Sequence, residues 1–337
     1  MAAAIVILPA PPVSDLPPPM TLVVNGSVRT APPGATLQEA ARMLGLNPAA
    51  GDLVDVEGVP LRRDFYPGHV VVNGQPAAAG TALHDGDAVE LVAGVDRVEP
   101  VTVDTLRVRA GTIPNPQAYL GTVGGEQIIT KGTLSGKLVS ATFRPVGEAT
   151  VRPAVALTFD DGPSPRYTLR ILRTLRQRNV PATFFVVGYL ARRYPDVVRR
   201  LVESGMSLGN HSMHHPGTRP FADLPLHEIR EQIERGHGVV TELGERSAGF
   251  RPPGGSWSGA VRDVAAAEGE RIILWSVDAE DFAGLPPRVV ARRVVREAEP
   301  GSIVLLHDGG GNRTATVKAL PRIITGLRKK GLAFESL

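Results

Sequence analysis

Two adjacent carboxylates and a pair of histidines are the residues of this sequence best suited to chemistry. Asp160 and Asp161 directly follow an apolar run that begins at Val155. Adjacent carboxylates repel one another unless a cation or a shared proton relieves them, although Asp-Asp-Gly-Pro is also a good turn sequence. His211 and His215 are four residues apart, a spacing that suits a metal ion. Two imidazoles and one carboxylate would leave coordination positions open, as in a catalytic hydrolytic site.

The elements around these residues predict where they lie. Apolar runs typical of strands occur at 155–159, 182–187, 207–210, 247–251, 271–277, 302–306 and 332–334. Helical stretches such as 226–243 and 288–299 separate them. Strands that alternate with helices predict an α/β fold with a parallel sheet, and seven or so strands predict a closed or nearly closed barrel. Pro216 disfavours a helical His215, so we expect the histidines on a loop or a single turn.

Further reactive residues follow other predicted strands. Arg251 comes directly after the strand into Phe250, Asp281 follows the run that ends at Val277, and His307 closes the strand from Ser302. Because catalytic residues of such barrels lie where the strands end, we expect these side chains to meet the carboxylate and histidine cluster.

These motifs resemble, in order from Val155 to Leu337, those of carbohydrate esterase family 4 polysaccharide deacetylases, also called the NodB homology domain. Thr-Phe-Asp-Asp-Gly at 158–162 and His-Ser-x-x-His at 211–215 are the most specific of them. The resemblance implies a distorted (β/α) barrel over residues 151–337. It also implies removal of acetyl groups from N-acetylglucosamine units of chitin, peptidoglycan or related polymers.

The resemblance assigns roles around the metal. Asp160 is similar to the catalytic base of the family, and Arg251 to the residue that orients it. The ligands of a divalent metal, usually zinc, would be Asp161, His211 and His215.

The resemblance also assigns the acid and the substrate pocket. His307 is similar to the catalytic acid and Asp281 to its partner. Leu305 resembles the wall of the acetyl pocket. Gly254 stands where the family often has Tyr, and Phe282 where it usually has Trp, so the shape of the sugar-binding surface should differ from that of relatives.

The sequence before residue 151 predicts three segments without a catalytic constellation. Residues 1–20 are Pro-rich and should be extended and flexible. Residues 21–100 contain two Asn-Gly hairpins and a capping box at Thr36 and Glu39. Their order of hairpin, helix and strands resembles a β-grasp, ubiquitin-like domain. Residues 101–150 predict a small β module or a connector packed on its neighbour.

Composition limits the remaining possibilities. The chain has 337 residues, a net charge of +3 and no cysteine, so a disulfide framework is excluded. Its basic residues form no stripe typical of nucleic-acid binding. The apolar run at 2–8 is too short for a membrane span and lacks the basic flank of a signal peptide. We expect an extracellular or cell-envelope protein that acts on an N-acetylated polysaccharide, and its oligomeric state is unknown.

Two alternatives stay open at this point. A barrel of the same family could hydrolyse small cyclic amides or imides, although the retained His211 and His215 argue against that reading. The chain could also be a catalytically idle wall-binding protein, although candidates for base, ligands and acid are all in place.

Overall fold

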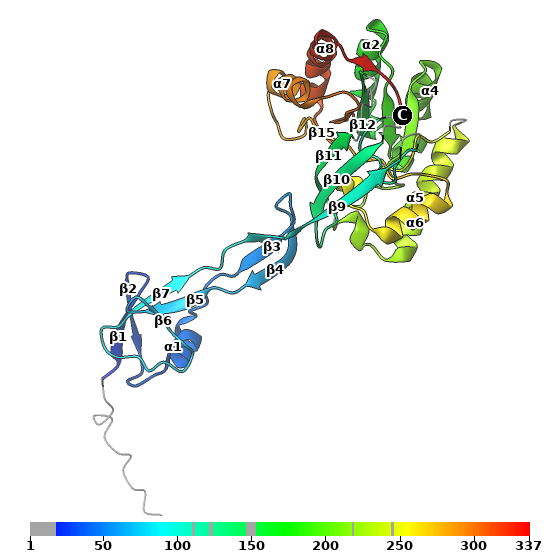
Figure 1. Cartoon of the computed structure of the whole chain (residues 1–337). Coiled ribbons are helices and arrows are strands. Elements are labelled where there is room, and N and C mark those ends of the chain that lie inside the picture. The colour runs from blue at the N-terminus through cyan, green and yellow to red at the C-terminus, as the bar shows by residue number, and fades with distance from the viewer. Residues whose placement is uncertain (1–17, 110–111, 121–123, 146–152, 218, 244–245) are drawn as a thin grey trace, which may run out of the picture. The chain divides into compact units, whose positions relative to one another are not determined.

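The computed structural model describes residues 18–337 except 110–111, 121–123, 146–152, 218 and 244–245. Most of the predicted Pro-rich segment therefore lies outside the described residues. The chain divides into two compact units, residues up to Val98 and residues from Glu99 onward (Figure 1). Within the described ranges, no helix is long and apolar enough to cross a membrane.

The first unit contains a five-stranded mixed sheet and one helix. The strands, in spatial order, are β2 (Ser27–Ala31), β1 (Met20–Val24), β7 (Ala88–Val92), β5 (His69–Val72) and β6 (Gln75–Pro76). Asn25 and Gly26 both have positive φ angles, 45° and 79°, as the predicted two-residue hairpin requires. The predicted capping box is present at the start of helix α1 (Leu37–Leu44). A second sheet contains β4 (Pro60–Tyr66), β3 (Gly51–Val54) and β8 (Arg97–Val98).

The second unit begins with a three-stranded antiparallel sheet. Its strands, in spatial order, are β11 (Leu138–Pro145), β10 (Gly125–Gly132) and β9 (Val101–Val108). Ile129 and Ala141 of this sheet share one buried cluster with Phe221, Phe250 and Trp257 from much later in the chain. The segment predicted as a small β module or a connector packed on its neighbour thus belongs to the same compact unit as the residues that follow it.

A parallel sheet forms the centre of this unit. Its strands, in spatial order, are β14 (Ser207–Asn210), β13 (Thr183–Val186), β12 (Ala154–Gly162), β16 (Ile303–His307) and β15 (Val277–Asp278), with β17 (Ala333–Phe334) paired to the start of β12. Every residue from Ala154 to Asp160 is buried, which explains the unbroken apolar run. All pairings in this sheet are parallel, so the strands end at one common edge.

Two predicted strands are only partly formed. The run at 247–251 contributes a single bridging residue, Phe250, which pairs with Asn210 on one side and Ile272 on the other. Pro252 and Pro253 have no backbone N–H, so the hydrogen-bond ladder cannot continue past Arg251. The run at 271–277 similarly forms bridges and then the short β15.

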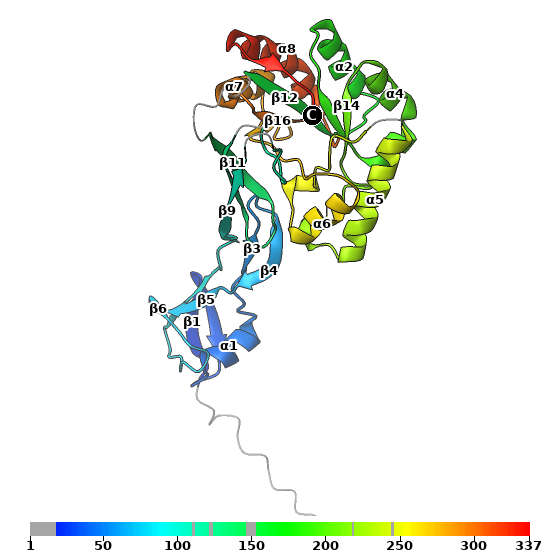
Figure 2. The same ribbon diagram turned by 45° about the vertical axis from the view of Figure 1, so that its right-hand side comes forward.

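Helices cover the outside of the parallel strands. In Figure 2, α8, α2, α4 and α5 follow one another around them. The helices are α2 (Thr168–Gln177), α3 (Gly188–Arg193), α4 (Pro195–Glu203), α5 (Leu226–Glu242), α6 (Gly259–Ala267), α7 (Pro287–Glu297) and α8 (Thr314–Lys329), with 3₁₀ turns η2 (Phe221–Asp223) and η3 (Pro253–Gly255). The stretches predicted as helical at 226–243 and 288–299 correspond to α5 and α7.

Candidate active site

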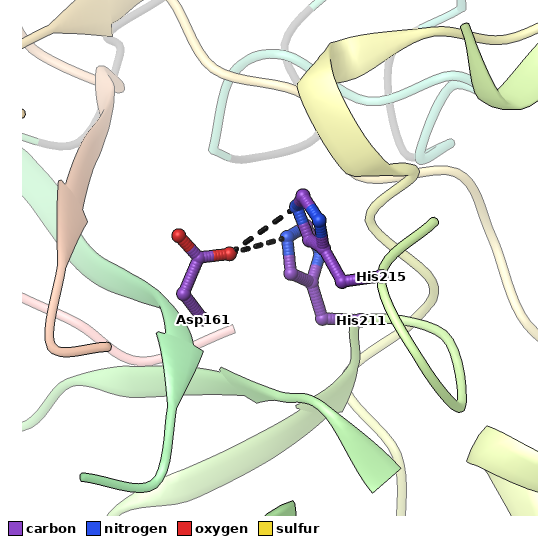
Figure 3. A group of neighbouring side chains, drawn as sticks. All are labelled: Asp161, His211 and His215. Atoms are coloured by element: carbon purple, nitrogen blue, oxygen red, sulfur yellow. Dashed lines mark ion pairs between the residues drawn. The ribbon is translucent and has the colours of Figure 1, made fainter. Parts of the chain in front are cut away.

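Asp161, His211 and His215 converge at the common edge of the parallel strands. One ligand atom of each lies within 4.8 Å of the others (Figure 3). The Nε2 atoms of His211 and His215 lie 3.4 and 3.3 Å from the same oxygen, Oδ1 of Asp161. Among the described residues this is the cluster with the geometry of a metal site. The structure therefore brings together the three residues that the sequence predicted as ligands.

Local backbone structure fixes Asp161. Its φ of 71° lies in the left-handed region, which a residue other than glycine adopts only when its surroundings enforce it. Gly309 and Gly310 pack directly against this residue, because an added Cβ would lie 1.8 Å from the Asp161 carbonyl oxygen or 2.3 Å from its Oδ2. Arg313 holds this glycine loop by donating to the Gly309 carbonyl at 2.5 Å.

Hydrogen bonds on the far side of the histidines orient them. The Nδ1 atom of His211 lies 2.7 Å from the carbonyl oxygen of Arg251, so Nδ1 carries a proton and Nε2 is the ring nitrogen that faces the cluster. The backbone N–H of His215 donates to Oγ of Ser212 at 3.0 Å. The segment is a loop, as the position of Pro216 predicted.

The charges of the cluster suit a cation. Burial opposes ionisation of Asp161, but the neighbouring His211 outweighs it and holds the pKa of Asp161 well below its ordinary value. Burial, together with the charge of His211, lowers the pKa of His215, which favours the neutral imidazole that a metal requires. An ionised carboxylate and two imidazoles, of which that of His211 is oriented by the Arg251 carbonyl, make a donor set that fits a divalent metal.

Asp160 and Arg251 form a buried ion pair beside this cluster. Nη1 of Arg251 donates to Oδ1 of Asp160 at 2.8 Å and to Oγ1 of Thr158 at 2.7 Å. The remaining guanidinium nitrogens donate to the carbonyls of Ile273 and Leu274 at 3.3 and 3.1 Å. Each guanidinium nitrogen therefore donates at least one hydrogen bond, although the residue is completely buried. Oδ2 of Asp160 lies 3.9 Å from Nε2 of His211, so the second oxygen faces the metal cluster.

His307 and Asp281 form a second charged pair. Nδ1 of His307 donates to Oδ1 of Asp281 at 2.7 Å, and the backbone N–H of His307 donates to Oδ2 at 2.9 Å. Oγ1 of Thr316 donates to the same Oδ2 at 2.5 Å. Burial lowers the pKa of His307, but the hydrogen bond and charge of Asp281 outweigh it and raise the pKa to about 9. The imidazole is thus protonated at neutral pH, with Nε2 as its free donor.

The three predicted pocket residues differ in exposure. Leu305 is buried in β16, two residues before His307. Phe282 is exposed, and its ring meets that of His307 edge-on with centroids 5.5 Å apart. Gly254 is exposed with a φ of 61°, and a Cβ added there would lie 3.6 Å from Cε of Lys137. This left-handed backbone suits the glycine that stands in place of the family's tyrosine.

Sequence reasoning missed several supporting residues. Thr158, which bonds Arg251, is two residues before Asp160 on the same face of β12, so strand alternation could have indicated it. Thr316 and Arg313 carry no such local signal. Asp308 is fully buried, and burial raises its pKa to about 7 despite a hydrogen bond from Thr168.

Comparisons with known proteins agree with this geometry. Residues 147–273 match the family described as polysaccharide deacetylase. The chain is 38% identical over 185 residues to a peptidoglycan-N-acetylglucosamine deacetylase of Bacillus cereus, covering 54% of this chain and 85% of that relative. It is 36% identical over 196 residues to a chitooligosaccharide deacetylase of Sinorhizobium fredii, and the match covers 55% of this chain and 90% of that relative. The family 4 carbohydrate esterase from Streptomyces lividans, solved in complex with acetate, aligns with a TM-score of 0.50 at 34% identity over 54% of this chain and 91% of that chain.

The chain therefore belongs to the polysaccharide deacetylase family. Its enzymatic class is that of the hydrolases that cleave amide-linked acetyl groups. The residues matched by the family lie in the second unit. The β-grasp-like description of the first unit stays a prediction.

Proposed function

We propose that this chain hydrolyses the N-acetyl groups of an amino-sugar polymer by acid–base catalysis beside a divalent cation. The observation that carries the proposal is the placement of two charged pairs around one donor cluster. Asp160 and His307 are paired residues of the adjacent parallel strands β12 and β16, and Asp161 is the next residue. A carboxylate paired with a buried guanidinium and a protonated imidazole thus lie next to the three candidate ligands.

Each pair has a role in the reaction. Asp160 accepts a proton from the attacking water, whose oxygen bonds to the acetyl carbon. The carbon–nitrogen bond then breaks, and Nε2 of His307 gives its proton to the departing nitrogen, leaving acetate and a free amine. The positive charge of Arg251 compensates the negative charge of the buried Asp160 carboxylate, and the ion pair orients that carboxylate. Asp281 fixes the His307 tautomer by accepting from Nδ1.

Asp161, His211 and His215 would hold the cation, and zinc is the metal we propose. Two imidazoles and one carboxylate form a donor set typical of catalytic zinc sites, which keep a position open. When bound, such a cation polarises the acetyl carbonyl and acidifies the attacking water. The proposed substrates are peptidoglycan, chitin or related N-acetylglucosamine polymers, because named relatives are peptidoglycan and chitooligosaccharide deacetylases.

The proposal includes the fold and the location that go with this activity. The bridges through Phe250 and Ile272 extend the strand series from β14 toward β15 and support the predicted distorted barrel. We propose action in the cell envelope or outside the cell, where such polymers occur. Fractionation of cells that carry the tagged full chain tests the location.

The activity is tested by acetate release from N-acetylglucosamine oligomers together with metal analysis of the purified chain. The wild type should contain about one divalent metal per chain and release acetate, because the structure has one complete donor cluster among its described residues. His211→Ala should lose both properties. His227→Ala, at an exposed histidine of α5, is the matched control and should keep both. Absence of acetate release from the metal-loaded wild type would refute the proposal and favour a wall-binding role.

A further inference from the structure

Tyr189 and Phe282 are the two exposed aromatic residues among the described residues of the second unit, with 41% and 52% of their surface accessible. Tyr189 lies three residues after the last residue of β13, and Phe282 four residues after that of β15. Both strands end at the edge where the metal cluster lies. The exposed aromatic surface of this unit is therefore concentrated at the site, whereas the other aromatic side chains are buried or half-buried.

The ring of Tyr189 is part of a stacked pair. It lies over the imidazole of His214 with centroids 5.7 Å apart and an angle of 26° between the planes. His214 is also exposed, so the pair offers an aromatic surface to solvent. His214 directly precedes the candidate ligand His215, and adjacent Cα atoms are about 3.8 Å apart. The loop that carries His214 of the stacked pair is therefore the loop that supplies the candidate ligands His211 and His215.

Backbone hydrogen bonds join the two segments that carry these rings. The N–H groups of Gly188 and Tyr189 donate to the carbonyls of Ser212 and Met213 at 3.0 and 2.9 Å. The N–H of His214 donates to Oε1 of Gln232 in α5 at 2.8 Å. The start of α3 and the histidine loop are thus joined along their backbones, which places the two rings side by side.

This surface matches one ligand chemistry in particular. A pyranose ring has an apolar face of C–H groups and a rim of hydroxyls, whereas a tyrosine has an apolar ring and a polar tip. Core packing does not account for Tyr189, because two fifths of its surface stays accessible. A flat apolar sugar face would cover the pair while its hydroxyls remain in water.

We propose that Tyr189 and His214 form a binding platform for a pyranose ring of the polymer that neighbours the sugar being deacetylated. The inference rests on the proposed function, and it adds a subsite that makes the enzyme favour longer chains. The two residues bind substrate and take no part in the proton transfers. Phe282, beside His307 at the β15 side of the site, is the corresponding exposed aromatic at the other end of the cluster.

The test compares deacetylation of an N-acetylglucosamine dimer and hexamer by the metal-loaded full chain. An aromatic contact is worth about 0.5 to 1.5 kcal/mol, so Tyr189→Ala should lower kcat/KM for the hexamer by up to about tenfold. The loss should appear in KM, with kcat nearly retained, and should be much smaller for the dimer. Tyr189→Phe retains the ring and should restore most of the hexamer activity. His214→Ala should resemble Tyr189→Ala, whereas His227→Ala is its matched control at an exposed histidine.

Several results would overturn the platform. They are an equal loss for dimer and hexamer, a loss confined to kcat, or full hexamer activity in Tyr189→Ala. Metal content and thermal unfolding of each variant separate a binding loss from a folding defect. A wild type inactive on both oligomers would refute the proposed function itself, and the platform with it. Wild-type activity with equal variant losses would refute the platform alone.

Discussion

Replacing Asp281 with asparagine should move the alkaline limit of activity to lower pH. The Asp281 carboxylate holds the pKa of His307 at about 9 against burial, which acts in the opposite direction. Without that negative charge the pKa of His307 should fall, because burial still opposes the charged imidazole and only Asp161 and Asp160 remain to favour it. The acid must be protonated, so wild-type turnover should fall as the pH rises through about 9. Turnover of Asp281→Asn should begin to fall at a lower pH than that of the wild type.

The size of the effect follows from the same pKa values. Above the lowered pKa of the variant, each further pH unit should reduce the protonated fraction of His307, and with it kcat, by about tenfold. Loss of the oriented acid could bring the total toward the ~10² to 10⁴-fold typical of acid–base residues. Activity should partly recover on acidification. The assay is acetate release from an N-acetylglucosamine oligomer across the pH range.

The pH dependence of the free energy of unfolding tests the His307–Asp281 ion pair independently of activity. A histidine whose pKa is raised on folding stabilises the protein fully below its unfolded pKa and loses that contribution as the pH rises through its folded pKa. Raising the pKa from 6.5 to about 9 corresponds to about 3 kcal/mol. Urea unfolding should show Asp281→Asn destabilised by about this amount at pH 6, with the part due to His307 absent above pH 9.

Thr316→Val is the control for this prediction. It removes a hydrogen bond to Asp281 but leaves the carboxylate, so the alkaline limit should stay close to that of the wild type. An alkaline limit that does not move in Asp281→Asn would show that His307 is not the titrating acid, and the reasoning would be refuted.

Three further predictions concern the base, its partner and the extent of the catalytic unit. Asp160→Asn should keep the metal but lose roughly 10² to 10⁴-fold in turnover. Asp161→Asn should lose metal affinity, and its turnover should recover with added zinc. A zinc titration that rescues turnover of the first variant and not of the second would reverse the assignment of base and ligand. Arg251→Met should destabilise the chain by about 3 to 5 kcal/mol in urea unfolding, because it leaves Asp160 buried without a counter-charge, and an unchanged unfolding midpoint would contradict this. A chain that starts at Glu99 should keep dimer deacetylation. One that starts near Arg152 should be poorly folded, because it lacks the sheet packed on the catalytic unit. Equal thermal unfolding of the two would show that this sheet is dispensable.

The sequence alone was sufficient where a local pattern carries the information. The buried run before Asp160, the Asn-Gly hairpin and the capping box each depend on neighbouring residues, and all three appear as predicted. The candidate ligands could be predicted because Asp161 lies at the end of one strand, the histidines follow another, and parallel strands end at one edge. Pro216 similarly indicated a loop for the histidines.

Only the tertiary structure determined which side chains contact one another across the chain. Arg251 pairs with Asp160 and Thr158, more than ninety positions away, and Thr316 completes the bonding of Asp281. These contacts depend on how the strands and helices pack, and no local period encodes that packing. The β9–β11 sheet likewise has an ordinary strand pattern, yet its inner face packs against Phe221 and Trp257. Alternation specifies which face of a strand is apolar but not the partner that covers it, because apolar burial has no direction of its own.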